Sequence, residues 1–154
     1  MSMSTIGVPL EGFGVYCRAA AAEGAVLLKN EGHMFPLKKE EMVSVFGRCQ
    51  FETYRSGTGS GGAVNVPYAV NIYDGMRESG SFTLNEELAD IYRAWLKDHP
   101  FDNGGGGWAA EPWHQKEMVI TEEIAAAAAE KSEKAIFIIG RTPGEDKDYA
   151  NEAG

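Results

Sequence analysis

The chain has 154 residues, of which 44% are hydrophobic and 24% are charged, so it is long and apolar enough for one folded domain with a core. Its 14 basic and 23 acidic residues give a net charge of −9, which disfavours binding to nucleic-acid phosphates and to anionic membrane surfaces. The N-terminal sequence has neither the basic nor the apolar region of a signal peptide, and no apolar run approaches the roughly 18 residues of a membrane span. We therefore expect a cytoplasmic protein with no nucleic-acid or membrane partner.

The cysteine and histidine residues give no sign of a metal site. Cys17 and Cys49 lie in unrelated contexts without a CxxC pair, so we predict two reduced thiols in the core. The histidines are scattered, and none is paired with an acidic residue or a cysteine at metal-ligand spacing; they are His33, His99 and His114. Structural or surface roles are expected for them, and no metal or organic cofactor is predicted.

The first half of the chain predicts two helices around one buried strand. Residues 16–30, YCRAAAAEGAVLLKN, carry Ala, Val and Leu at the spacing of an amphipathic helix, and Gly32 follows as a stop signal. The β-branched run MVSVFG at residues 42–47 predicts a strand buried on both faces, as in a parallel sheet. A glycine-rich stretch then leads to Pro67, which suits the first turn of a helix over residues 67–79.

The second half predicts two more helices and a second strand. Asn85 is a suitable N-cap for the helix NEELADIYRAWLKDH. Residues 101–118 hold four consecutive glycines and two tryptophans, so no regular structure is expected there. Thr121 is a suitable N-cap for an alanine-rich helix, whose residues 125–129 are expected to pack against the sheet. The apolar run KAIFIIG at residues 134–140 predicts a buried strand.

Helices that alternate with short buried strands predict an α/β fold, a three-layer αβα sandwich with a mainly parallel sheet. Two strands are too few for such a sheet, because they leave its edges uncovered. We therefore expect residues 1–154 to form an incomplete sandwich domain. The exposed sheet edge offers a route to a homo-oligomer.

The glycine-rich stretch GTGSGG at residues 57–62 matches the GxGxxG spacing of a dinucleotide-binding loop. It begins ten residues after Gly47 instead of lying directly between a strand and a helix, and no acidic residue closes a second strand about twenty positions on. Two interpretations remain. The stretch is a flexible or tight turn, or it is a loop whose bare backbone and Ser60 hydroxyl let a ligand approach closely.

Glu145 lies in GRTPGED, on the loop that follows the second predicted strand. Loops at the carboxyl ends of parallel strands often carry chemistry. Glu145 is therefore either a catalytic carboxylate or a solvated charge in an acidic loop. Trp108 and Trp113 are equally open to two interpretations, because an aromatic ring can stack on a sugar or fill a groove between layers.

Four segments in order, AAAEGAVLLKNEGHMFPL, VSVFG, YRSGTGSGGAVN and AIFIIGRTPGEDKD, resemble the α/β sandwich domain of glycoside hydrolase family 3, the β-glucosidase family. The resemblance implies a retaining glycosidase of two domains, in which a (β/α)8 barrel supplies an aspartate nucleophile and the sandwich supplies a glutamate as general acid and base. It implies that this glutamate is Glu145. The sequence departs from the family pattern at Pro143, where a small residue is usual, and at Asp146, where glycine is usual.

The resemblance also implies that Ser60 lines the sugar subsite. We further predict that Gly59, Gly61 and Arg141 bind the substrate, a β-linked glucoside or xyloside. No segment resembles the barrel, which needs about 250 residues. The nucleophile that works with Glu145 is therefore expected in a barrel domain of the same polypeptide. The segments resemble bacterial members in which the sandwich precedes the barrel, with this chain as the N-terminal part. The alternative is a noncatalytic carbohydrate-binding or interaction module with an α/β sandwich fold.

Overall fold

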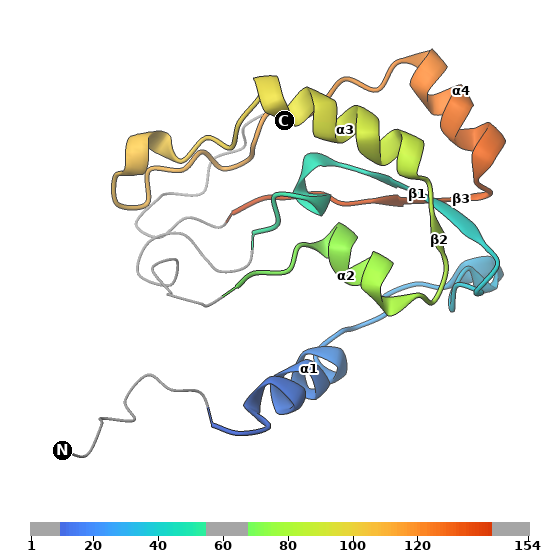
Figure 1. Cartoon of the computed structure of the whole chain (residues 1–154), viewed down its shortest axis with the longest axis horizontal. Coiled ribbons are helices and arrows are strands. Elements are labelled where there is room, and N and C mark those ends of the chain that lie inside the picture. The colour runs from blue at the N-terminus through green and yellow to red at the C-terminus, as the bar shows by residue number, and fades with distance from the viewer. Residues whose placement is uncertain (1–9, 55–67, 143–154) are drawn as a thin grey trace. The chain divides into compact units, whose positions relative to one another are not determined.

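The structure is a computed structural model that describes residues 10–54 and 68–142, and it divides the chain into two units, Met1–Pro36 and Leu37–Gly154. Helices and strands alternate in the second unit (Figure 1). The elements in chain order are α1 (Phe13–Glu23), η1 (Glu31–His33), β1 (Met42–Phe46), η2 (Arg48–Gln50), α2 (Ile72–Ser79), β2 (Thr83–Leu84), α3 (Glu86–Asp98), η4 (Gly104–Gly106), α4 (Glu122–Lys131) and β3 (Lys134–Phe137).

The first unit holds helix α1, whose predicted boundaries of residues 16–30 are wrong at both ends. The helix begins at Phe13 and ends at Glu23, because Gly24 terminates it well before Gly32. No residue of α1 is buried. Cys17, on this helix, is exposed, so the prediction of a core thiol is wrong for Cys17 and confirmed for Cys49.

The second unit is built on β1, the central strand of a three-stranded parallel sheet with the order β2-β1-β3. The last four residues of β1 are at most 6% exposed. The prediction of a strand buried on both faces is therefore confirmed for β1. The third strand, β2, was not predicted, because a two-residue strand is too short to show a period.

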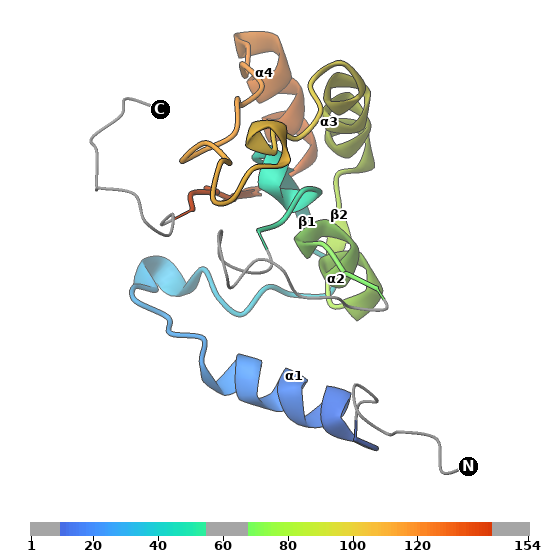
Figure 2. The same ribbon diagram turned by 90° about the vertical axis from the view of Figure 1, so that its left-hand side faces the viewer.

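Helices cover both faces of this sheet. Val45 packs with Tyr73 of α2 on one face, while Phe46 packs with Tyr92 of α3 and Ala128 of α4 on the other. Figure 2 shows α2 on one side of the strands and α3 and α4 on the opposite side. The predicted three-layer αβα arrangement is confirmed in this unit. Within α4, however, Ala128 is the only buried residue, so most of the alanine tract does not pack closely against the described strands.

Polar side chains fix the starts of α2, α3 and α4. Asn71, Asn85 and Thr121 each accept a hydrogen bond from the backbone N–H three residues on, at 2.7 Å, 3.3 Å and 3.3 Å. The predicted caps Asn85 and Thr121 are confirmed. Helix α2 begins at Ile72, five residues later than predicted, because Asn71 caps it. Pro67, the expected first residue, lies outside the described residues.

Strand β3 is not the fully buried strand predicted for residues 134–140. Ile136 packs against the core, but Phe137 is 68% exposed and Ile139 is 90% exposed. No other strand in the described part of the chain pairs with the far edge of β3. Apolar side chains on both faces are typical of a strand inside a parallel sheet. The exposed face of β3 therefore agrees with an incomplete sheet.

Gly47, directly after β1, lets the chain continue beside β3. Its φ of 97° lies in a region that glycine alone adopts readily. A Cβ atom at this position would collide with the carbonyl oxygen of Ile138. The close approach extends the ladder between the strands, since the N–H of Ile138 donates to the carbonyl of Phe46 at 2.9 Å.

We expect Gly47→Ala to lower the free energy of unfolding by about 3 kcal/mol or more, because it adds a backbone collision to the strain of a positive φ. Gly80 supplies a matched control, since its φ is 60° but nothing lies within 4 Å of a Cβ there. Gly80→Ala should cost only about 1 kcal/mol. Denaturant unfolding of both variants measures the difference, and equal losses would contradict the close packing at Gly47.

Candidate functional site

The candidate site lies at the carboxyl ends of strands β1 and β3. The residues after each strand lead into one of the two predicted site loops. Arg141 lies there, in the described segment that follows β3. The other predicted site residues lie outside the described residues; they are Gly59, Ser60, Gly61 and Glu145. The described residues nevertheless show how the chain enters both loops.

Arg48 is the central polar residue of this region. It follows Gly47 and is 1% exposed. Its guanidinium forms an ion pair with Glu52 and donates to the carbonyl of His99 at 2.9 Å and to that of Lys116 at 2.8 Å. The charge also lies 5.4 Å from the ring centroid of Trp95. These contacts attach the end of α3 and residues 114–118 to the end of β1.

The backbone and neighbours of Arg48 add further connections. Its N–H donates to the Glu117 carboxylate at 2.9 Å, and the N–H of Gly47 donates to the Tyr92 hydroxyl at 2.8 Å. Burial, together with the negative charge of Glu117, raises the pKa of the Cys49 thiol to about 11. Cys49 is therefore a neutral packing residue at physiological pH and not a nucleophile.

The entries to the two predicted site loops lie against each other. Tyr54 is the last described residue before residues 55–67, and Gly140 lies three residues before residues 143–154. A Cβ atom at Gly140 would lie 3.2 Å from Cε2 of Tyr54 and would collide with Sγ of Cys49. Glycine is required at this position by the close approach of the two segments. The fold thus brings together the residues that lead into the two predicted loops, which are about 85 residues apart in sequence.

Arg141 and Thr142 continue from Gly140 and contact a segment that lies far away in the sequence. The Arg141 guanidinium lies 5.6 Å from the ring centroid of Trp113. The N–H of Thr142 donates to the Trp113 carbonyl at 2.9 Å, and Thr142 is 2% exposed. Trp113 is buried at 9% exposure, which favours the groove-filling interpretation of this residue, whereas Trp108 is 62% exposed.

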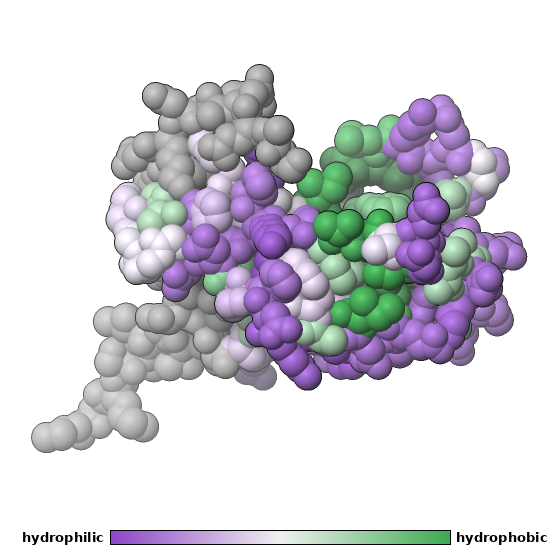
Figure 3. Space-filling model, turned by 90° about the horizontal axis from the view of Figure 1, so that it is seen from above, coloured by the Kyte–Doolittle hydropathy of each residue, from purple (hydrophilic) through white to green (hydrophobic). Residues whose placement is uncertain are grey.

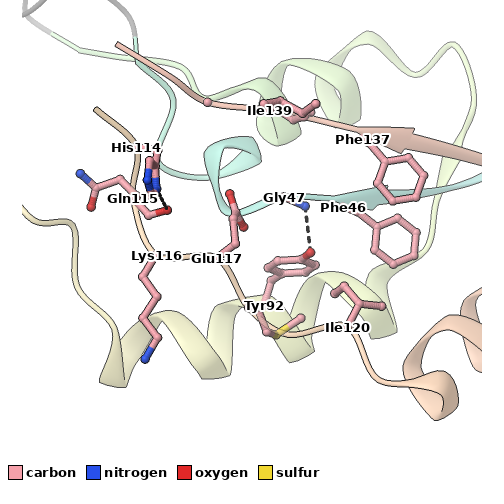
Figure 4. Close-up of a pocket in the computed structure, with 13 residues that line it drawn as sticks. Phe46, Gly47, Tyr92, His114, Gln115, Lys116, Glu117, Ile120, Phe137 and Ile139 are labelled. Carbon is pink, nitrogen blue, oxygen red and sulfur yellow. Dashed lines mark hydrogen bonds between the residues drawn. The ribbon is translucent and has the colours of Figure 1, made fainter. Parts of the chain in front are cut away.

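An open cavity of about 620 Å³ lies beside these segments. Aromatic and aliphatic side chains line one end, and polar residues of the segment before α4 line the other (Figure 4). The labelled lining residues are Phe46, Gly47, Tyr92, His114, Gln115, Lys116, Glu117, Ile120, Phe137 and Ile139. Hydrophobic residues also gather between hydrophilic regions on the face seen from above (Figure 3).

The described part of the cavity offers mainly apolar surface, and its ionisable lining side chains include His114, Lys116 and Glu117. Glu117 is the one carboxylate among its lining residues, and it already accepts a hydrogen bond from the Arg48 backbone. Over residues 10–54 and 68–142, no group of three His, Cys, Asp or Glu side chains is arranged to hold a metal ion. In the same part of the chain, no helix is both long and apolar enough to cross a membrane.

Sequence reasoning missed the roles of Arg48 and Gln115. A local signal for Arg48 was present, because an arginine directly after a buried strand, with Glu52 four residues on, suggests a buried ion pair. No such signal pointed to Gln115, whose amide pairs with the backbone of Asp102.

The family model of the glycosyl hydrolase family 3 C-terminal domain matches residues 25–153. The chain belongs to this family. A β-glucosidase from Ruminococcus albus is 49% identical over 133 residues, which cover 86% of this chain and 14% of that protein. Among solved structures, a β-glucosidase from Paenibacillus barengoltzii is 65% identical, with a TM-score of 0.93 over 97% of this chain and 16% of the other. β-Glucosidase 3B from Thermotoga neapolitana in complex with α-D-glucose is 31% identical, with a TM-score of 0.79 over 94% and 20%.

The chain therefore spans 14% to 20% of the length of these relatives. The match in fold is close over nearly the whole chain, so the α/β sandwich architecture is shared with much longer proteins.

We expect Arg48→Ala to lower the free energy of unfolding by about 3 kcal/mol, because it removes a buried guanidinium and leaves the Glu52 carboxylate and two partly buried carbonyl groups without their donor. Arg77→Ala is the matched control. Arg77 also pairs with a nearby carboxylate, but its side chain is 53% exposed, so its loss should cost less than about 1 kcal/mol. Denaturant unfolding compares the two variants. A small loss for Arg48→Ala would show that its contacts are not central to this region.

Proposed function

We propose that this chain is the acid/base-bearing part of a retaining β-glucosidase-like hydrolase. The observation that carries the proposal is the close approach of Gly140 to Tyr54, whose ring would lie 3.2 Å from a Cβ atom at Gly140. It brings the entry of the glycine-rich loop beside the entry of the predicted loop with Glu145. A sugar bound over the carboxyl ends of β1 and β3 would then meet both loops. Family membership and the β-glucosidase names of the relatives support the same reaction class.

Retaining hydrolysis needs two carboxyl groups about 5–5.5 Å apart. In this proposal Glu145 protonates the leaving oxygen and later activates water. The second carboxyl group, an aspartate nucleophile, belongs to a (β/α)8 barrel domain of the same polypeptide outside these 154 residues. Residues 1–154 are then part of the α/β sandwich domain.

Ser60, Gly59, Gly61 and Arg141 are proposed to contact the sugar, a β-linked glucoside or xyloside. The bare backbone of the glycines would allow close approach, and Arg141 would lie at the rim, where Trp113 holds its guanidinium. The mechanism calls for no metal or cofactor. A cytoplasmic location stays a prediction from the N-terminal sequence.

Glu145→Ala in the complete enzyme should slow hydrolysis by about 100-fold or more for glycosides with poor leaving groups, which need protonation. Activated aryl glycosides should be slowed much less in the glycosylation step, and azide should speed their turnover by replacing the water that Glu145 activates. Steady-state kinetics on both substrate types measure the contrast.

Asp146→Asn is the matched control for this experiment, because it removes the neighbouring carboxylate and leaves Glu145 intact. It should show neither the dependence on leaving group nor the rescue by azide. Equal losses on both substrate types for Glu145→Ala, without rescue, would remove the acid/base role. Sugar binding by a complete polypeptide with no turnover would favour the noncatalytic module.

Purified residues 1–154 should hydrolyse no aryl glycoside, because the proposed nucleophile lies outside them. They should also self-associate through the open edge of β3, giving a light-scattering mass above 16.7 kDa. Ile139→Lys, at a position that is 90% exposed, should reduce this association without a large loss of stability. Turnover by the 154-residue chain alone would contradict the proposed division of the site.

A further inference from the structure

The segment of residues 101–118 has no part in the proposed chemistry, yet it is held firmly in the described structure. Only one short turn in it, η4, is regular. Trp113 and Gln115 are nevertheless buried, at 9% and 3% exposure. Burial of irregular backbone is costly unless its polar groups are hydrogen-bonded. The hydrogen-bond partners of this segment therefore show to which parts of the fold it is attached.

Two sets of hydrogen bonds hold the segment. The side chain of Gln115 bonds to both backbone groups of Asp102, accepting from its N–H at 2.7 Å and donating to its carbonyl at 2.9 Å. This pair closes residues 102–115 into a loop. Arg48 then holds the end of the loop, through its guanidinium on the Lys116 carbonyl and its N–H on Glu117. The loop is thereby attached to the carboxyl end of β1.

Trp113 lies inside this anchored loop and contacts the chain where it leaves β3. Its carbonyl accepts from the N–H of Thr142, and its ring lies beneath the Arg141 guanidinium. Thr142 is almost fully buried, at 2% exposure. The backbone at Thr142 is therefore bonded to the main chain of a residue 29 positions earlier, and the buried indole of that residue anchors its main chain.

We propose that Trp113 is a positioning residue for the loop that carries Glu145. The inference rests on the proposed function, since it gives a reason for fixing the chain at Thr142. Glu145 follows Thr142 by three residues, a span of at most about 10 Å. Because only three residues separate the two, the backbone direction at Thr142 limits where Glu145 can lie, and a misplacement of about 1 Å can slow a reaction about 100-fold.

The test compares Trp113→Ala, Trp113→Phe and Val119→Ala in the complete enzyme. Trp113→Ala should lower kcat/KM about 10- to 100-fold for poor leaving groups and much less for activated aryl glycosides. The Thr142 amide should exchange with deuterium about tenfold faster or more. Trp113→Phe keeps an aromatic ring under Arg141 and should recover most of both effects.

Val119→Ala is the control, because Val119 lies close by in sequence and is 79% exposed. It should change neither kinetics nor exchange. If Trp113→Ala does not fold, Trp113→Leu replaces it, since leucine fills part of the space without a ring. Equal losses on both substrate types, or unchanged exchange at Thr142 in a folded variant, would overturn the proposal.

Glu145→Ala separates this inference from the function on which it rests. A dependence on leaving group in Glu145→Ala but not in Trp113→Ala would overturn the positioning role alone. Absence of that dependence in Glu145→Ala would overturn the proposed function and, with it, the role of Trp113 in positioning an acid/base group.

Discussion

The buried charge of Arg48 is the constraint on which the carboxyl end of the sheet depends. A guanidinium removed from water is strongly unfavourable unless its donors are paired. Glu52 and the carbonyls of His99 and Lys116 provide that pairing, so they must stay where the charge requires them. Because these acceptors come from three separate segments, one side chain determines how the segments meet.

Two glycines allow close packing in the same region. Gly47 lies where a Cβ atom would collide with the backbone of Ile138, and Gly140 lies where it would collide with the side chain of Cys49. The first keeps the chain after β1 against Ile138, and the second keeps the chain after β3 against Cys49 and Tyr54. The polar pairing at Arg48 and the close contacts at these glycines act on neighbouring residues, since Gly47, Arg48 and Cys49 follow one another after β1.

Features that depend on residues close in sequence could be predicted, and contacts between residues far apart in sequence could not. The helix starts at Asn85 and Thr121 could be predicted because a cap bonds to a residue only three positions away. The burial of β1 followed from its β-branched run. Strand β3 has an equally apolar sequence but an exposed face, because the pattern records which neighbours a strand prefers and not whether they are present in the chain.

The candidate site also has parts that the sequence predicted and parts that it did not. The sequence and its resemblance to a family pointed to the loops at the ends of the strands, and the fold brings their entries together at Tyr54 and Gly140. The partners of Arg48 at His99 and Lys116, some 50 to 70 residues away, carry no local signal. The same holds for the contact between Trp113 and Thr142.

A site shared between domains places an unusual demand on this edge of the sheet. If Glu145 acts together with a carboxylate from another domain, it must keep its position relative to that carboxylate. Side chains on a long loop lose that position easily, since each unconstrained residue adds conformational freedom. The irregular segment anchored by Arg48 and Gln115 holds the backbone at Thr142, three residues before Glu145. Its value to the protein would then lie in the rigidity it gives to a neighbouring loop and not in chemistry of its own.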